Sequence, residues 1–431
     1  MIEAKAASPH SSIGECVSGR LRLRPPAQID ENDAQGKPRS LAGLVVGKRK
    51  VYVVDKTQSP GPHAHWMLTE IHEQPSTIAA TLNRYVHENG FRDDVCAPIR
   101  HWLQTATEGI VIAASGSSRH AGLAAELMIE DLSGIAVDVE YASEYSCRTA
   151  SGRTNVAVMV ISQSGETADT LASLRKANLA GHATLAITNV AASTMAREAK
   201  VSYPTEAGRE RAIPATKSFT AQLLNLQILS LLAAELRGAL TASEVGARLA
   251  FLTSLPAHLE PQLKDLEGSV RAIAEQYRTV KNFLFLGRGI HYPIASEGAL
   301  KLKEAAYLHA EGYPSGELKH GPNALVSDST ALVMIATVDR TDPCSLLRYE
   351  KSLHLMRDMR RQGANILTVA NAGDDAVRAL ATHMICVEET REALFPLCEA
   401  IPLQFFAYFM AINNGIDVDH PRNLTKAVLV E

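Results

Sequence analysis

The sequence lacks the cysteine pattern of a disulfide framework or a zinc site. Its six cysteines are scattered over 431 residues and none of them forms a C-x-x-C pair. They are Cys16, Cys96, Cys147, Cys344, Cys386 and Cys398. We see no other metal-ligand cluster and expect neither a metal nor another cofactor. Scattered cysteines are typical of a reducing compartment, which predicts a cytoplasmic protein.

The sequence also lacks a surplus of basic residues. Lys and Arg number 43 against 47 Asp and Glu, a formal net charge of −4. A nucleic-acid surface needs a basic surplus, so we expect a small-molecule partner instead. The first residues contain no apolar core of a signal peptide. The most apolar stretch, "LFPLCEAIPLQFFAYFMAINNG", contains Pro396, Glu399 and Pro402, which predicts a buried helix rather than a membrane span.

What the chain does have is a repeated alternation of strand and helix patterns. The apolar runs "EGIVIAASG", "NVAVMVISQSG" and "HATLAITN" alternate with amphipathic helical segments. The same order returns roughly 175 residues later with "KNFLFLGRG", "STALVMIATVD" and "ANILTVAN". Continuous apolar strands between helices indicate a parallel sheet covered on both faces. We infer an α/β protein with two copies of one unit, joined by helices.

This pattern predicts four segments. Residues 1–65 form an irregular extension, in which "KVYVVD" alternates like a short strand. A first α/β domain with leading helices covers 66–250, and a second covers 251–415. Residues 416–431 form a short C-terminal tail.

Two loops rich in hydroxyl groups follow predicted strands. Ligands of an open parallel sheet bind beyond the carboxyl ends of its strands, where helix N-termini offer free N–H groups. One loop contributes Ser162, Ser164 and Thr167, and the other contributes Ser115, Ser117 and Ser118. Gly116 and Gly165 let the backbone approach a ligand closely. The loops predict a phosphate site, and the alternative is that Ser164 or Thr167 merely caps a helix. They form neither a P-loop nor a G-x-G-x-x-G motif, so a nucleotide is not indicated.

The segment "SEGALKLKEAAYLHAEGYPSGELKHGP" combines charge with a rigid loop. On a helix, Glu297, Lys301, Glu304 and Leu308 share one stripe. The stripe is either an exposed row of Glu–Lys pairs or part of a site. The loop after it, with three glycines and two prolines, would present His320.

The C-terminal stretch "DVDHPRNLTKAVLVE" contains one lysine, Lys426. One interpretation is a docked tail with this lysine at the surface. The other is a lysine carried into the site, where desolvation favours the neutral amine that forms a Schiff base with a ketone.

Together these stretches resemble the isomerase part of the glutamine–fructose-6-phosphate aminotransferase (glucosamine-6-phosphate synthase) family. The resemblance covers roughly residues 66–431 and includes "EIHEQP" and "ATKSFTAQL". It implies two tandem sugar isomerase (SIS) domains, flavodoxin-like with a parallel sheet in three layers, followed by the short tail. It also implies a homodimer.

The resemblance implies a role for each matching residue. Glu304 would move a proton between C1 and C2, and Lys426 would form the Schiff base. His320 would assist ring opening from the neighbouring subunit, and Lys301 would lie near the reacting oxygens. The residues implied to hold the sugar phosphate are Ser117, Ser118, Ser162, Gln163, Ser164 and Thr167. Ile213 and Thr425 would line the pocket.

The implied reaction converts fructose 6-phosphate to glucosamine 6-phosphate. The family's glutaminase domain uses an N-terminal cysteine, whereas here Met1 is followed by Ile2 and about 65 residues precede the resemblance. We therefore expect ammonia, with a separate glutaminase as one source, to be the direct donor. Pro214 and Thr425 also depart from the residues usual in the family.

Two further functions stay open. The chain could run the same reaction backwards as a glucosamine-6-phosphate deaminase, because a catalyst accelerates both directions. It could also be a sugar-phosphate sensor without turnover, although residues 1–65 show no helix-turn-helix pattern.

Overall fold

The computed structural model describes residues 59–148 and 155–429. The chain divides into two units, Met1–Ser59 and Pro60–Glu431, and the helices and strands given below belong to the second. The expected strand "KVYVVD" and most of the predicted extension lie outside the described residues.

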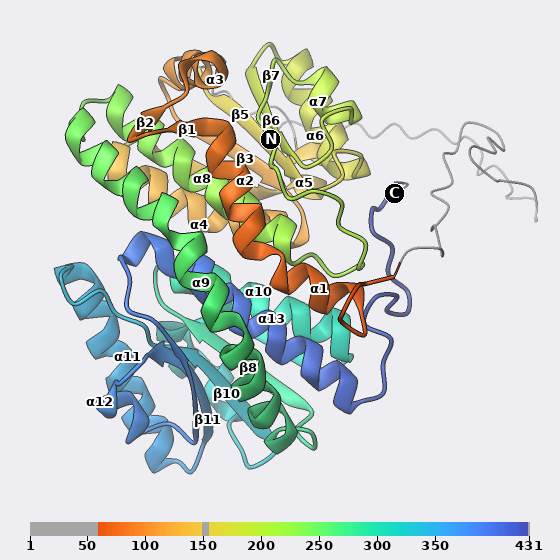
Figure 1. The fold of residues 1–431 in the computed structure, drawn as a ribbon, viewed down its shortest axis with the longest axis vertical. Helices are drawn as coiled ribbons and strands as arrows, with labels where there is room; N and C mark the ends of the chain where they lie inside the picture. The colour runs from red at the N-terminus through yellow and green to blue at the C-terminus, as the bar shows by residue number, and fades with distance from the viewer. Residues whose placement is uncertain (1–58, 149–154, 430–431) are drawn as a thin grey trace, which may run out of the picture. The chain divides into compact units, whose positions relative to one another are not determined.

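The first half of this unit is built on a five-stranded parallel sheet with the order β4-β3-β5-β6-β7 (Figure 1). Its strands are β3 (Ile110–Ala114), β4 (Val137–Tyr141), β5 (Ala157–Ser162), β6 (Ala183–Thr188) and β7 (Val201–Ser202). The helices around it are α3 (Asp93–Gln104), α4 (Gly116–Ser133), α5 (Ala142–Cys147), α6 (Ala168–Leu179), α7 (Thr194–Glu198) and α8 (Lys217–Leu236). Before them come α1 (Trp66–His72), α2 (Gln74–Tyr85) and a short hairpin of β1 (Val86–His87) and β2 (Gly90–Phe91).

The second half repeats this arrangement with the order β12-β11-β10-β8-β9. Its strands are β8 (Asn282–Gly287), β9 (His309–Pro314), β10 (Thr330–Ile335), β11 (Asn365–Asn371) and β12 (His383–Val387). Its helices are α10 (His291–Ala306), η1 (Ser315–His320), η2 (Pro322–Leu325), α11 (Pro343–Arg361), α12 (Asp375–Arg378), η3 (Glu392–Leu394) and α13 (Phe395–Asn413). The long helix α9 (Ala242–Gln276) leads into it. Read from the other edge, this order is β9-β8-β10-β11-β12, the same order as in the first sheet, with the second strand at the edge beside the first, which confirms two copies of one α/β unit.

Both sheets are covered on both faces, as their apolar strands predict. Along β3, Ile110 and Ile112 belong to the core that includes α4 and α8, whereas Val111 and Ala113 pack in smaller clusters with residues of α6. Because side chains alternate between the faces of a strand, a fully buried strand has to be apolar throughout. Each half is therefore a three-layer α/β domain.

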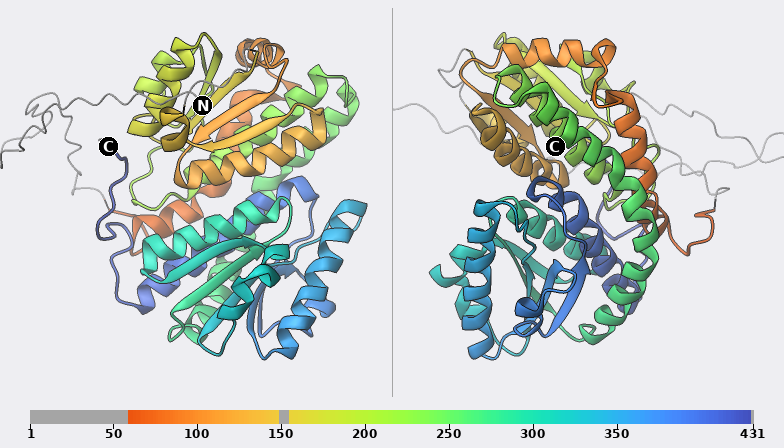
Figure 2. Two further views of the ribbon diagram at one scale, coloured as in Figure 1. Left: turned by 180° about the vertical axis from the view of Figure 1, so that it is seen from behind. Right: turned by 60° about the vertical axis from the view of Figure 1, so that its left-hand side comes forward.

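The two halves meet through helices. Helix α10 contacts α4 and α13, and α13 contacts α8 and α9. Figures 1 and 2 show α10 and α13 between the two sheets. One continuous hydrophobic core includes Ile112 of the first sheet, Leu229 of α8, Phe406 of α13 and Phe283 of the second sheet. Packing at this junction brings α4 of one half beside α10 of the other.

Two helices are long and apolar enough to span a membrane by length and composition, α8 and the segment Glu392–Asn413. Within the described structure, 89% and 94% of their most apolar windows are buried. The prediction that the second segment is a buried helix is confirmed, because its side chains fill the core between the halves.

Several features of the structure differ from what the sequence pattern predicted. The helix expected to carry Glu297, Lys301, Glu304 and Leu308 ends at Ala306, because Tyr307 adopts a left-handed conformation with φ 55° and a strand begins at His309. Leu308 is therefore not on the helical stripe. The edge strands β4, β7, β9 and β12 had not been predicted. The proposed division at 250/251 falls inside α9.

Candidate active site

The two hydroxyl-rich loops lie at the switch point of the first sheet. Strands β3 and β5 are neighbours, and the chain continues outward to β4 on one side and β6 on the other. Helix α4 begins at Gly116 directly after β3, and α6 begins at Ala168 after the loop that follows β5. A crevice at such a point is where open α/β sheets bind ligands.

The loop after β5 is ordered by its own hydroxyl groups. Ser162 Oγ accepts a hydrogen bond from Gly165 N at 3.2 Å and lies 3.0 Å from Thr167 Oγ1. Ser164 Oγ accepts from Glu166 N at 3.2 Å. Gly165 has φ 64°, and a Cβ there would lie 2.2 Å from Ser193 Oγ, so this position requires glycine.

The capping interpretation is wrong for Thr167. This residue is the N-cap of α6, but its side chain makes no capping hydrogen bond, and neither does Ser115 at the N-cap of α4. Among the described residues, the hydrogen bond of the Ser164 side chain is the one to Glu166 N within the turn. The hydroxyls therefore line the loops rather than closing the helices, and N–H groups at the two N-termini can face a ligand.

The C-terminal tail reaches this loop. Ala168 N, at the first turn of α6, donates to Val428 O at 2.9 Å. Further back along the tail, Ile213 N donates to Asp419 O at 3.1 Å. In Figure 1 the tail leaves α13 and runs along the side of the unit toward the first half. Lys426 therefore lies two residues before Val428, which contacts the end of the hydroxyl-rich loop after β5.

Lys426 points into the protein. Its Nζ donates to Glu210 Oε2 at 2.5 Å and to Ala212 O at 2.6 Å, and the side chain is 26% exposed. The interpretation of a docked tail with a surface lysine does not describe this geometry.

Glu210 is the buried counter-charge of this lysine. Its carboxylate also accepts from Thr216 N at 2.9 Å, Ser218 N at 3.1 Å and Ser218 Oγ at 2.7 Å. Burial acts to raise the pKa of Glu210, but the Lys426 charge and these hydrogen bonds outweigh it and hold the pKa below its usual value. Glu210 is thus a carboxylate that stabilises an ammonium group.

A second network of charged side chains extends along α10 and across to α4. Buried Lys301 hydrogen-bonds the Glu304 carboxylate, and its Nζ lies 3.4 Å from Glu297 Oε1. His120 Nδ1 of α4 lies 2.8 Å from Glu297 Oε2. Burial acts to lower the pKa of Lys301, but Glu297 and Glu304 outweigh it and raise the pKa. The alternative of an exposed Glu–Lys stripe is wrong, because Glu297 and Lys301 are buried.

This network of charged side chains extends to the hydroxyl groups that follow β3. Burial acts to raise the pKa of Glu297, while Lys301, His120 and a hydrogen bond from Ser117 lower it below its usual value. Ser117, which lies in the first turn of α4 rather than in a loop, thus connects the first half to the carboxylates and lysine of the second. The sequence placed Ser117, Lys301 and Glu304 in one site, and the structure brings them into one hydrogen-bonded chain.

The remaining predicted residues are less tightly connected. Ser118 is buried in α4, and the Gln163 carbonyl accepts from Asn189 N at 3.0 Å. Thr425 is exposed and donates to Ala427 O at 3.1 Å. His320 is exposed at the end of η1, and among the described residues of this chain its side chain has no hydrogen bond or ion pair. The role of His320 stays a prediction.

Sequence reasoning missed three residues. Glu210 and His120 stand in no motif that singles them out, and their importance follows only from contacts across the fold. Glu70 stands in the quoted "EIHEQP" stretch, which could have drawn attention to it. Its carboxylate bonds the backbone N–H groups of Arg211 and Ala212.

At the switch point of the second half, charged side chains accompany the hydroxyl group of Thr341. A cavity of about 920 Å³ beside Gly289 and Asp339 is lined by carboxylates and arginines, among them Asp342 and Arg348. Next to it, His291 is buried between Glu399 at 2.8 Å and Glu392 at 3.3 Å. This cavity therefore has a mixed lining of both charge signs, unlike the uncharged hydroxyl groups at the switch point of the first half.

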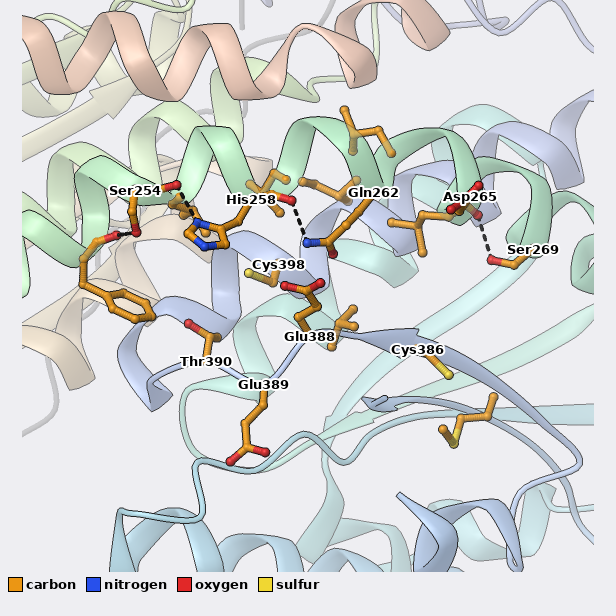
Figure 3. Close-up of a pocket in the computed structure, with 18 residues that line it drawn as sticks. Ser254, His258, Gln262, Asp265, Ser269, Cys386, Glu388, Glu389, Thr390 and Cys398 are labelled. Atoms are coloured by element: carbon orange, nitrogen blue, oxygen red, sulfur yellow. Dashed lines mark hydrogen bonds between the residues drawn. The ribbon is translucent and has the colours of Figure 1, made fainter. Parts of the chain in front are cut away.

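A different cavity, of about 530 Å³, lies between α9 and the end of β12 (Figure 3). His258 Nδ1 lies 2.8 Å from Ser254 O, and Gln262 donates to His258 O at 2.6 Å, so both polar side chains are held by their own helix. None of the predicted site residues lines either cavity. Among the described residues, no group of three or more His, Cys, Asp and Glu could hold a metal ion.

Fold and site together define a duplicated, flavodoxin-like α/β protein with hydroxyl loops and a buried lysine–carboxylate pair. The SIS domain model matches residues 105–232 and 276–414. The chain therefore belongs to the SIS domain family.

Comparison with curated relatives gives a more specific similarity than the SIS domain match. The chain is 43% identical over 372 residues to glutamine–fructose-6-phosphate aminotransferase [isomerizing] of Bordetella parapertussis, covering 86% of this chain and 59% of the relative. Identity to the Xanthomonas campestris protein of that name is 41%, covering 86% and 60%. The chain thus corresponds to the SIS part and spans about three fifths of these relatives' length.

Similarity to solved structures points to the same relatives. The C-terminal domain of glucosamine-fructose-6-phosphate aminotransferase from Francisella tularensis matches with a TM-score of 0.78 and 34% identity, covering 85% of this chain and 100% of that one. Glucosamine-6-phosphate deaminase from Thermotoga maritima matches with a TM-score of 0.62 and 23% identity, covering 84% and 99%. The second likeness shows the fold alone.

Proposed function

We propose that the protein converts fructose 6-phosphate to glucosamine 6-phosphate, with ammonia as the direct nitrogen donor. The observation that carries the proposal is the position of Lys426. It points inward onto Glu210, while its own tail bonds the N-terminus of α6 through Val428. An amine for imine chemistry and a loop suited to phosphate are thus joined by one short segment.

In this proposal the hydroxyl loops bind the phosphate group of the sugar. Hydroxyls and helix N-termini donate hydrogen bonds to phosphate oxygens. The proposed binding residues are Ser117, Ser118, Ser162, Gln163, Ser164 and Thr167, with Ile213 and Thr425 near the pocket. This anchoring would hold the carbonyl end of the open sugar toward Lys426 and Glu304.

The proposed reaction begins with opening of the sugar ring. His320, proposed to come from the partner subunit of a homodimer, would open the ring by proton transfer. The neutral amine of Lys426 would add to the C2 ketone, and water would leave to give an imine. Ammonia would then displace the lysine at C2. Glu304, aided by Lys301, would take a proton from C1 and return it to C2, while the proton of the C1 hydroxyl passes to the imine nitrogen. This leaves an aldehyde at C1 and an amine at C2.

The source of the ammonia is a separate question. The residues assembled here handle a carbonyl, an amine and a carbon-bound proton. We propose that a glutaminase, as a partner or as a further domain, supplies ammonia to this site. The same residues can catalyse deamination of glucosamine 6-phosphate, since every step is reversible.

Assaying the purified chain in both directions tests the proposal. We expect glucosamine 6-phosphate from fructose 6-phosphate with ammonium and none with glutamine alone. A much higher kcat/KM for ammonia release from glucosamine 6-phosphate would instead support a deaminase. Sugar-phosphate binding without turnover in either direction would support a sensor and overturn the proposal.

A further inference from the structure

Glu70 lies near the ion pair formed by Lys426 and Glu210. It lies on α1, its residue is 1% exposed, and it is not among the residues proposed to bind or convert the sugar. Its Oε1 accepts hydrogen bonds from the backbone N–H of Arg211 and, at 3.4 Å, of Ala212. The carbonyl of the same Ala212 accepts from Lys426 Nζ. Glu70 thus hydrogen-bonds the backbone segment whose carbonyl group hydrogen-bonds Lys426.

The N-terminus of α1 is tied to the same tail. The Asp419 carboxylate accepts from Trp66 N and Met67 N, both at 2.8 Å, and Asp419 O accepts from Ile213 N. Helix α1, the segment after Glu210 and the C-terminal tail therefore form a closed ring of contacts. A shift of Glu70 would move the Ala212 carbonyl relative to Lys426.

The other oxygen of this carboxyl group has no hydrogen-bond partner in the part of the chain that the structure describes. Glu70 Oε2 is buried and makes no hydrogen bond among the described residues. A buried carboxylate oxygen without a partner is costly, and such groups in native proteins need a reason. Here the charged groups around it are Glu210, Lys426 and Lys217, with Glu73 paired to Lys217 at 2.6 Å.

We propose that Glu70 is a positioning residue for Lys426: it aims the Ala212 carbonyl at the lysine, and its own proton state changes how firmly the lysine ammonium is held. The inference rests on the proposed function, in which Lys426 forms an imine. With Glu70 neutral, Glu210 alone balances the ammonium. With Glu70 ionised, a second buried negative charge favours the ammonium and opposes release of its proton.

The electrostatics of the site agree with this geometry. Burial, followed by the charge of Glu210, raises the pKa of Glu70 to about 8, against the lowering effects of Lys426 and the Arg211 N–H. The group is therefore mainly neutral at pH 7 and ionises at the alkaline edge of the physiological range. Loss of Glu70's proton would make the amine of Lys426 less available as pH rises through 8.

Imine trapping tests the inference. The full chain is mixed with fructose 6-phosphate and borohydride, and the rate of covalent labelling at Lys426 is measured from pH 6 to 10 by mass spectrometry. In Glu70→Gln, one oxygen still accepts from Arg211 while the ionisable group is gone. We expect its half-maximal labelling to move to lower pH by about one unit relative to the native chain.

A matched control separates charge from position. Glu73→Gln removes a carboxylate three residues away that pairs with Lys217 instead, and we expect its labelling profile to match the native one. Glu70→Asp keeps the charge on a shorter side chain, so we expect slower labelling with the native pH dependence. Native thermal unfolding of Glu70→Gln would show that the shift does not arise from a loss of fold.

The outcomes are distinct. An unchanged midpoint in Glu70→Gln, with the native protein labelled at Lys426, overturns the role of Glu70 and leaves the proposed function standing. Absence of labelling at Lys426 in the native protein at every pH overturns the proposed function and the inference with it.

Discussion

Lys426 Nζ and Glu210 Oε2 lie 2.5 Å apart although 216 residues separate them in the chain. The contact closes the C-terminal tail onto the segment before α8, and it buries the carboxylate completely. Removing one member of a buried pair leaves an uncompensated charge, which typically costs about 3–5 kcal/mol. Substitutions at Lys426 should therefore keep the positive charge if catalysis is to be separated from stability.

Lys426→Arg meets this condition. A guanidinium can still pair with Glu210 but cannot form an imine, so we expect amination to fall by about 10³-fold or more. Product formation from fructose 6-phosphate and ammonium measures the loss, and thermal unfolding should stay close to native. Lys264→Arg, on the exposed side of α9, is the control and should keep full activity. Native turnover in Lys426→Arg would contradict the Schiff base.

Glu304→Gln should separate binding from proton transfer. The amide keeps the shape of the side chain but cannot take a proton from C1, so we expect kcat to fall by about 10²–10⁴-fold with little change in sugar-phosphate affinity. Buried Lys301 would keep Glu297 as a partner, at 3.4 Å. Exchange of the C1 proton with deuterated water reports the step directly. Lys303→Gln on the exposed side of α10 is the control. Normal exchange in Glu304→Gln would identify another base.

Gly165→Ala should damage the hydroxyl loop. The added Cβ would meet Ser193 Oγ at 2.2 Å in a left-handed conformation, so we expect a loss of about 1–3 kcal/mol of unfolding free energy and weaker sugar-phosphate binding. Gly181→Ala is a matched control, because Gly181 has φ 82° with no atom within 4 Å of its Cβ position. Calorimetric titration with fructose 6-phosphate should show native affinity for Gly181→Ala only. Equal affinity in both variants would separate this loop from the phosphate.

The sequence predicted the duplicated fold because apolar strands and amphipathic helices alternate within short stretches. Through their likeness to a family it also predicted that Ser162, Glu304 and Lys426 share one site, and this stays a prediction. Glu210, His120 and Glu70 could not be found this way, since each acts through a partner from a distant element. The end of α10 was misplaced because the left-handed Tyr307 carries no glycine signal.

The charged cluster of the second half should make stability depend on pH. Burial acts to lower the pKa of His291, but Glu399 and Glu392 outweigh it and raise the pKa to about 10. Because the folded value exceeds the unfolded value, this stabilisation is complete below about pH 6.5 and is lost as pH rises through 10. We expect His291→Gln to cost about 3–5 kcal/mol at pH 6 and much less at pH 10.5. Urea unfolding of both proteins at the two pH values measures the difference, and an equal cost at both would contradict it.

His320 offers a test of the proposed homodimer. It is exposed and has no side-chain hydrogen bond or ion pair among the described residues of its own chain, so a partner subunit is the proposed place of action. His320→Ala and Lys426→Arg should each be nearly inactive alone. If His320 acts across the interface, a mixed dimer of the two variants has one site with both native residues. Random exchange makes half the dimers mixed, so activity should return to about a quarter of native. If His320 acts within its own chain, no site regains both residues and mixing restores nothing, which would contradict the shared site.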